Sequence, residues 1–139
     1  MTVTINGKDA EKTWGIVFDS SSISSLMTPA GMKDYIENSS RAEHGKRVIT
    51  NATLAKVDSR SVVLTFSLHA NTEDRFFERY SSFCKEIQKT GELKISISIQ
   101  PSIAYKLIYK SCNQFTQYNN RLAKFSLKCE EPNPNDRSL

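Results

Sequence analysis

The sequence contains few of the residues on which most catalytic and metal sites depend. Its 139 residues include three cysteines and two histidines. Cys84, Cys112 and Cys129 lie far apart in the sequence, whereas zinc ligands usually come in local pairs, so free thiols are expected. Only His44 and His69 could act as a general base, and no Gly-x-Ser-x-Gly motif is present. We therefore expect no enzymatic activity, no metal and no cofactor.

Long apolar runs and glycine-rich phosphate loops are also missing. No stretch reaches the length of a membrane-spanning helix, and the N-terminus lacks the basic region and apolar run of a signal peptide. Gly45 and Lys46 resemble the end of a phosphate-binding loop. However, Ser40 stands where that motif requires glycine, and Arg47 stands where it requires a hydroxyl. A charged turn explains this segment more simply.

The clearest pattern runs from Ser61 to Gln100 and predicts a strand, a helix and a second strand. Residues 62–69 and 93–100 alternate between apolar and polar, as half-buried strands do. Residues 71–90 are apolar at the helical period, with Asn71 or Thr72 as the cap and Gly91 at the expected left-handed end. The apolar stripe of this helix consists of Phe76, Phe77, Tyr80, Phe83, Cys84 and Ile87. The residues expected to form the core are Leu64, Phe66, Phe77, Phe83, Ile87, Ile95 and Ile97.

Other segments are expected to be strands and turns. Alternation or apolar clustering predicts strands at residues 3–5, 14–18, 53–57, 103–110 and 123–129. Asn6 and Gly7 predict a tight turn, and residues 58–60 predict a hairpin that joins 53–57 to the strand at Val62. Asp19 or a following serine could cap a single helical turn that ends at Leu26. Residues 113–120 are polar and are expected to form an exposed hairpin loop.

These elements predict a mainly β (α+β) protein. About seven strands and one helix favour an antiparallel β-sandwich or a partly open barrel with one packed α-helix. Residues 1–130 are expected to form a single domain. Residues 131–139 contain two prolines and are expected to form a flexible C-terminal tail.

The net charge of +4 is small, but lysines gather on one face of the predicted sheet. They alternate with the apolar residues and are Lys94, Lys106, Lys110, Lys124 and Lys128. Solvated lysines that prevent unwanted pairing of strand edges explain this pattern, and a small nucleic-acid-binding module is the alternative. A ligand-carrier β-barrel is a second alternative, although the phenylalanines of the helix predict a filled interior.

Residues 30–51 show weak periodicity between two predicted strands. A span of this length without regular structure is unusual in a compact domain unless it reaches a partner. Tyr35 and Ile36 are isolated apolar residues within it and would need a surface to bury against. We therefore predict an arm that docks on another subunit.

Several short motifs resemble small tail proteins of phages and prophages, in particular the distal tail and tail-tube families. The motifs in the N-terminal third are Ile5-Asn-Gly-Lys-Asp-Ala10, Thr13-Trp-Gly15, Leu26-Met-Thr-Pro-Ala30, Lys33-Asp-Tyr35, Asn38-Ser-Ser-Arg41 and Gly45-Lys46, and with the segments that follow the similarity covers most of the chain. The similarity continues through Asp58-Ser-Arg60 and the strand, helix and strand at the centre. The tail-tube families share a β-sandwich or barrel flanked by one helix, with a long loop that reaches a neighbour.

The resemblance implies a structural subunit of a phage or prophage tail. Such subunits assemble as rings, usually hexamers, through loops and strand edges, and contact neighbouring tail proteins. The protein would be made in the cytoplasm of the bacterial host and would reside in the virion tail, with no membrane partner and no nucleic acid. The expected interface residues are Tyr35, Ile36, Arg41, Lys46, Arg47, Phe115 and Tyr118.

Overall fold

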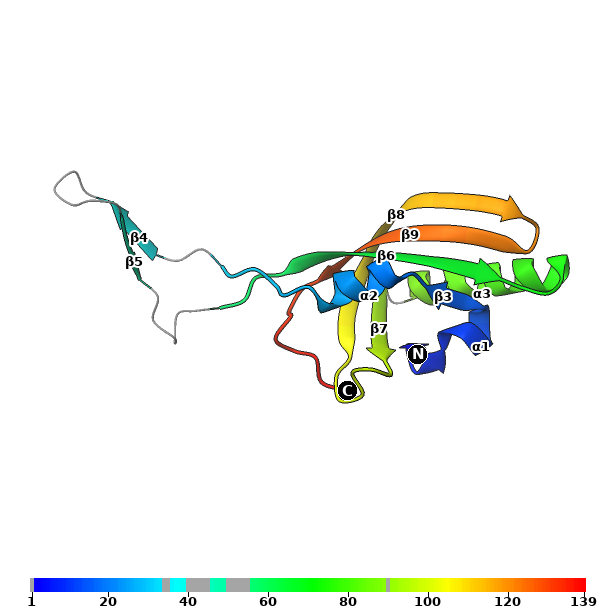
Figure 1. Cartoon of the computed structure of the whole chain (residues 1–139), viewed down its shortest axis with the longest axis horizontal. Coiled ribbons are helices and arrows are strands. Elements are labelled where there is room, and N and C mark those ends of the chain that lie inside the picture. The colour runs from blue at the N-terminus through cyan, green and yellow to red at the C-terminus, as the bar shows by residue number, and fades with distance from the viewer. Residues whose placement is uncertain (1, 34–35, 40–45, 50–55, 90) are drawn as a thin grey trace.

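The computed structural model describes residues 2–33, 36–39, 46–49, 56–89 and 91–139, with the backbone alone for residues 36–39 and 46–49 (Figure 1). The described helices are α1 (Ala10–Trp14), α2 (Ser20–Met27) and α3 (Glu73–Lys89). The described strands are β1 (Val3–Ile5), β2 (Lys8–Asp9), β3 (Ile16–Phe18), β4 (Ile36–Ser39), β5 (Lys46–Ile49), β6 (Arg60–His69), β7 (Glu92–Ile97), β8 (Tyr105–Asn119) and β9 (Leu122–Glu131).

Seven of these strands form one antiparallel sheet in the order β2-β1-β7-β8-β9-β6-β3. The strands at its two ends, β2 and β3, are joined through α1, which contacts both. β2 and β3 do not pair with each other, so the sheet is not closed into a barrel. The prediction of a mainly β, antiparallel protein is confirmed.

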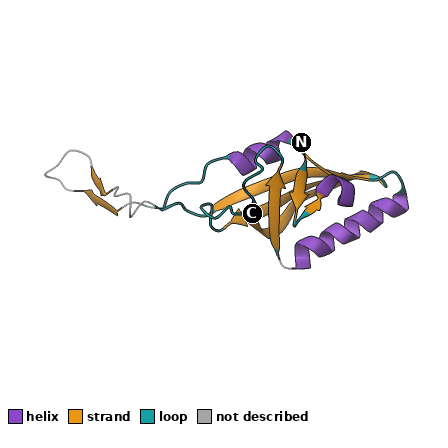
Figure 2. Ribbon diagram, turned by 90° about the horizontal axis from the view of Figure 1, so that it is seen from below, coloured by secondary structure: helices purple, strands orange, loops and turns teal. Residues whose placement is uncertain are grey.

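The helix α3 packs against one face of this sheet (Figure 2). Phe76, Phe83 and Ile87 are its buried residues, as the helical period requires for one apolar face. Phe83 meets Phe66 of β6, with the ring centroids 5.4 Å apart. The prediction for Phe77 was wrong: this side chain is 46% exposed, because it lies one helical position away from the buried stripe. The other six predicted core residues are buried.

The predicted strand at residues 14–18 was also wrong in part, because Trp14 ends α1 and only Ile16–Phe18 form β3. The Asp9 side chain caps α1 by accepting a hydrogen bond from the backbone N–H of Lys12. Gly15 ends the helix at φ 66°, and a Cβ there would lie 2.2 Å from the backbone oxygen of His69. This tight reversal places the Trp14 ring in the core, where its Nε1 donates to Ser82 Oγ at 3.1 Å.

The serine-rich helix α2 is longer than the single turn that the sequence predicted. It lies beside the part of β6 that extends beyond its pairing with β3. There the serine side chains form the hydrogen bonds with β6 that a neighbouring strand would otherwise form. Ser22 Oγ accepts from Thr65 N at 2.6 Å and donates to Thr65 O at 2.5 Å. Ser25 Oγ accepts from Val63 N at 3.3 Å. The outer edge of β6 is therefore covered by hydrogen-bonding groups along much of its length.

Two predicted connections differ from the structure. Residues 113–119 belong to β8 and form no loop, since β8 and β9 make a long hairpin that turns at Asn120 and Arg121. The predicted hairpin between residues 53–57 and β6 was wrong, because β6 pairs with β3 and β9, and Val57 bridges to Met32. Residues 53–55 lie outside the described residues. The bridge forms the base of the arm, and Figure 1 shows the β4–β5 hairpin apart from the seven-stranded sheet.

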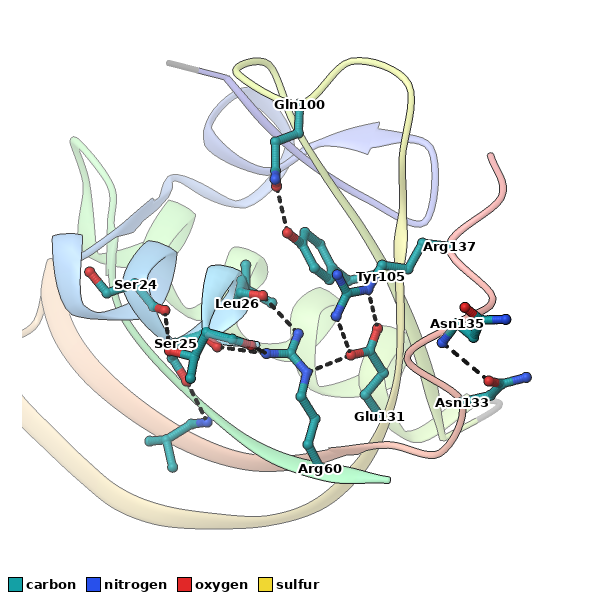
Figure 3. Close-up of polar contacts among 12 residues, drawn as sticks. Ser24, Ser25, Leu26, Arg60, Gln100, Tyr105, Glu131, Asn133, Asn135 and Arg137 are labelled. Atoms are coloured by element: carbon teal, nitrogen blue, oxygen red, sulfur yellow. Dashed lines mark hydrogen bonds and ion pairs between the residues drawn. The ribbon is translucent and has the colours of Figure 1, made fainter. Parts of the chain in front are cut away.

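The C-terminal segment is attached through a buried ion cluster (Figure 3). Glu131 is fully buried and accepts hydrogen bonds from Arg60 and Arg137. The Arg137 guanidinium also lies over the Tyr105 ring, 4.8 Å from the ring centroid. The backbone oxygen of Arg137 accepts a hydrogen bond from Ala104 N. The flexibility expected for residues 131–139 stays a prediction, as does the single-domain boundary at residue 130.

Candidate interaction surface

The outer edge of β8 is the longest strand edge without a partner in the described part of the chain. β7 pairs with β8 from Tyr105 to Ile108, and Tyr109 N donates to Gly91 O at 2.8 Å. From Lys110 to Asn119, none of the described strands pairs with β8 on that side, and Figure 1 shows this part of β8 as the outermost strand. Alternate residues of a strand direct their backbone N–H and C=O groups towards the same edge, and an open edge offers these groups to another chain.

Irregular pairing between β8 and β9 decides which β8 side chains face α3. The register shifts after Tyr109, after Cys112 and after Gln117, so three residues of β8 have no opposite partner in β9. As a result Tyr109, Cys112 and Phe115 lie opposite buried residues of β9. Directly opposite residues share a face of the sheet, so all three face α3 despite their spacing of three.

Exposed aromatic side chains gather beside this edge. Phe115 is 44% exposed and Tyr118 is 60% exposed. The Phe115 ring contacts the Tyr80 ring of α3, with a centroid separation of 5.9 Å, and Phe77 lies one helical turn before Tyr80. We name these four residues, together with the β8 edge from Lys110 to Asn119, the β8 edge surface. Aromatic residues are enriched at protein–protein interfaces, and an open edge with exposed aromatics fits a protein partner.

Some of the thiols and phenols near α3 and the β8–β9 hairpin have raised pKa values. The pKa of Tyr80 is raised mainly by the nearby Cys84 thiol, and burial raises the pKa of Cys84. Burial raises the pKa of the Cys129 thiol to about 12. These shifts keep the thiols protonated near neutral pH, which is the opposite of what an activated nucleophile requires.

The predicted interface residues fall into two groups that the structure does not bring together. Phe115 and Tyr118 belong to the β8 edge surface. Ile36, Lys46 and Arg47 belong to the β4–β5 hairpin, in which Asn38 pairs with Arg47 and Ser39 with Lys46. Tyr35 and Arg41 lie outside the described residues.

Sequence reasoning missed the β8 edge itself and the exposure of Phe77. One signal was available: the sequence has no glycine or proline between Pro101 and Pro132, so an Asn-rich turn had to connect the strands. Asn119 supplies that turn, because its side chain accepts from the backbone N–H of Arg121 at 2.8 Å.

Other kinds of site find little support among the described residues. No group of three or more potential metal ligands occurs there. A depression of about 520 Å³ is lined partly by the charged side chains of Glu11, Lys12 and Arg79. Lysines of the β8–β9 hairpin form ion pairs, such as Lys124 with Asp19 at 3.3 Å and Lys110 with Glu130 at 3.2 Å. Among the described helices, none has the length and apolar character needed to cross a membrane.

Comparison with solved structures shows a phage-tail-like fold. One match is the crystal structure of the Dit (gp 19.1) protein of phage SPP1, described as a paradigm of the hub adsorption apparatus in phages that infect Gram-positive bacteria. The TM-score is 0.63 and the match covers 96% of this chain at 13% sequence identity. It covers 50% of the Dit chain, so this chain spans about half the length of that neighbour. Neither a protein-family model nor a curated protein sequence matches the chain.

Proposed function

We propose that this protein is a structural subunit of a phage or prophage tail, similar to distal tail or tail-tube proteins. The observation that carries the proposal is the shared fold with Dit over 96% of the chain. The subunit resides in the virion tail after synthesis in the host cytoplasm, and its partners are further copies of itself and neighbouring tail proteins.

In this proposal the subunits form a ring, most simply a hexamer. A ring closes when one surface of each subunit meets a different surface of the next. The β8 edge surface supplies one of these, because its backbone groups from Lys110 to Asn119 suit a partner in extended conformation. The three bulges bend β8, so a partner strand must follow the same curvature. Indiscriminate pairing of edges is thereby disfavoured.

The arm supplies a second contact. It leaves the domain through a short ladder in which Lys33 N donates to Lys56 O at 2.9 Å and Asp58 N donates to Gly31 O at 2.9 Å. The two strands of the β4–β5 hairpin pair with each other and with no other described strand. A small two-stranded hairpin is marginally stable by itself, so docking on an adjacent subunit would stabilise it.

Placing proline at Asn113 should abolish assembly through the β8 edge while the subunit stays folded. Asn113 is an unpaired bulge residue, and a bulge is a position where a strand tolerates proline. Proline removes a backbone donor and blocks the approach of another strand. The measurement is mass in solution by light scattering, with negative-stain imaging of rings. Asn113→Ala is the matched control and should assemble like the wild type.

Replacing the exposed Tyr118 by a charged residue gives a second test of the β8 edge. Tyr118→Lys changes a side chain that is 60% exposed, so folding should be preserved. Lysine on an edge strand opposes pairing, and the variant should shift the protein towards monomers. If both Asn113→Pro and Tyr118→Lys form rings like the wild type, the β8 edge is not the interface. A wild type that remains monomeric at its highest soluble concentration argues against self-assembly.

Removing the arm should also give a folded monomer. Replacing residues 34–55 by a short glycine-serine turn retains the ladder at Lys33 and Lys56, which suits a tight connection. We expect an unchanged melting temperature and loss of the ring in the same light-scattering experiment. A shortened protein that assembles like the wild type would show that the arm has no part in the interface.

A further inference from the structure

Two contacts hold α3 against β8. Between these contacts, each of the two elements carries one cysteine. At one end the Tyr80 and Phe115 rings are in contact, 5.9 Å apart. At the other end Tyr109 N donates to Gly91 O, just after α3. Cys84 lies between Tyr80 and Gly91 on the helix side, and Cys112 lies between Tyr109 and Phe115 on the strand side.

Burial and then the nearby Cys112 thiol raise the pKa of Cys84, so the two thiols lie close enough to interact. Cys84 follows Tyr80 by four residues, which places both on one face of the helix, and the nearby Cys84 thiol raises the pKa of Tyr80. Cys112 lies opposite the buried Leu127, so it faces α3 as Phe115 does. The register shift next to Cys112 creates this orientation, since regular alternation would place Cys112 and Phe115 on opposite faces.

Access differs among the three thiols. Cys112 is exposed, Cys84 is half-buried, and Cys129 is 1% exposed. All three are free in this structure. A soluble oxidant therefore meets Cys112 first, and Cys84 is the thiol placed to complete the reaction.

We propose that Cys84 and Cys112 form an intramolecular disulfide that fastens α3 to β8. With oxidised glutathione as the oxidant, the Cys112 thiolate attacks one glutathione sulfur, forms a mixed disulfide and releases one reduced glutathione. The Cys84 thiolate then attacks the Cys112 sulfur and releases the second reduced glutathione. Because burial raises the pKa of Cys84, this second step becomes faster as the pH rises above neutral. The protein loses two protons and two electrons, and these reduce one oxidised glutathione to two thiols. The proposal does not rest on assembly into a ring, but Cys112 lies within the β8 edge surface, so the reaction is that of the unassembled subunit.

To test this proposal, the fully reduced, full-length protein is incubated at low concentration with oxidised glutathione. We expect a monomer lighter by the mass of two hydrogen atoms, and a linked peptide pair containing Cys84 and Cys112 after proteolysis without reductant. The bond closes a loop of about 29 residues in the unfolded chain, which should raise the melting temperature by roughly 10 °C. Dithiothreitol should reverse both the mass change and the temperature shift.

Single variants separate this disulfide from its competitors. Cys84→Ser should stop at a stable mixed disulfide on Cys112, whereas Cys112→Ser should not react. Cys129→Ala is the matched control and should form the disulfide as the wild type does, because Cys129 is buried. A wild type that stops at the mixed disulfide, a bond that includes Cys129, or a dimer linked through two copies of Cys112 would each overturn the proposal.

Discussion

Replacing Phe83 by alanine should lower the free energy of unfolding by about 3–5 kcal/mol. The Phe83 ring lies within 5.4–6.1 Å, centroid to centroid, of the rings of Trp14, Phe66 and Phe125. It is 1% exposed, so the truncation removes apolar contacts and leaves a cavity where α3, α1 and the sheet meet. Urea or thermal unfolding followed by circular dichroism measures the loss.

Phe77→Ala is the matched control on the same helix. Its side chain is 46% exposed and contacts Phe76 at 5.4 Å, so we expect a change of less than about 1 kcal/mol. The two variants have the same change in side-chain volume and differ in burial. Equal losses of stability from Phe77→Ala and Phe83→Ala would contradict the packing of α3 described here.

The central strands and helix could be predicted because one physical rule governs each of them. β6 and β7 alternate between buried and partly exposed residues, and α3 repeats its apolar residues at the helical period. In both cases a single packed face decides the pattern. The boundary of that face was less predictable: Phe76 and Phe77 are adjacent, and only the packed structure decides which of the two is buried.

The short helices could not be predicted in the same way, because tertiary hydrogen bonds hold them. α1 has five residues, too few for a periodic signal, and its end depends on the approach of Gly15 to His69. α2 contains five serines among eight residues, and serine usually signals a loop. Its serines are explained only once β6 is seen beside it, with Thr65 and Val63 bonded to Ser22 and Ser25.

The open β8 edge could not be predicted from sequence, because it results from the difference in length between β7 and β8, and no local sequence pattern encodes that difference. β8 has 15 residues and β7 has six, so most of β8 extends beyond its neighbour. The aromatic residues Phe115 and Tyr118 were identifiable from sequence as exposed, but they were assigned to a loop.

The buried ion cluster at Glu131 is the second place where a single substitution should strongly lower stability, after Phe83. Glu131 is 0% exposed and accepts from Arg60 Nε at 2.5 Å and from Arg137 Nη2 at 3.0 Å. The Arg60 guanidinium also donates to the backbone oxygens of Leu26 and Thr28, at 2.7 and 2.6 Å. One carboxylate therefore connects the end of α2, the start of β6 and the C-terminal segment.

Glu131→Ala should lower the free energy of unfolding by about 3–5 kcal/mol, because it leaves the largely buried Arg60 charge without its carboxylate. Glu130→Ala is the matched control one residue away. Glu130 pairs with Lys110, and their side chains are 37% and 50% exposed, so the loss of this pair should cost less than about 1 kcal/mol. Arg137→Ala should fall between the two, since the Arg137 side chain is 26% exposed and its removal leaves Glu131 paired with Arg60. Denaturant unfolding of the wild type and the three variants measures this order of stabilities. A Glu131→Ala protein as stable as Glu130→Ala would show that the cluster does not hold the C-terminal segment in place.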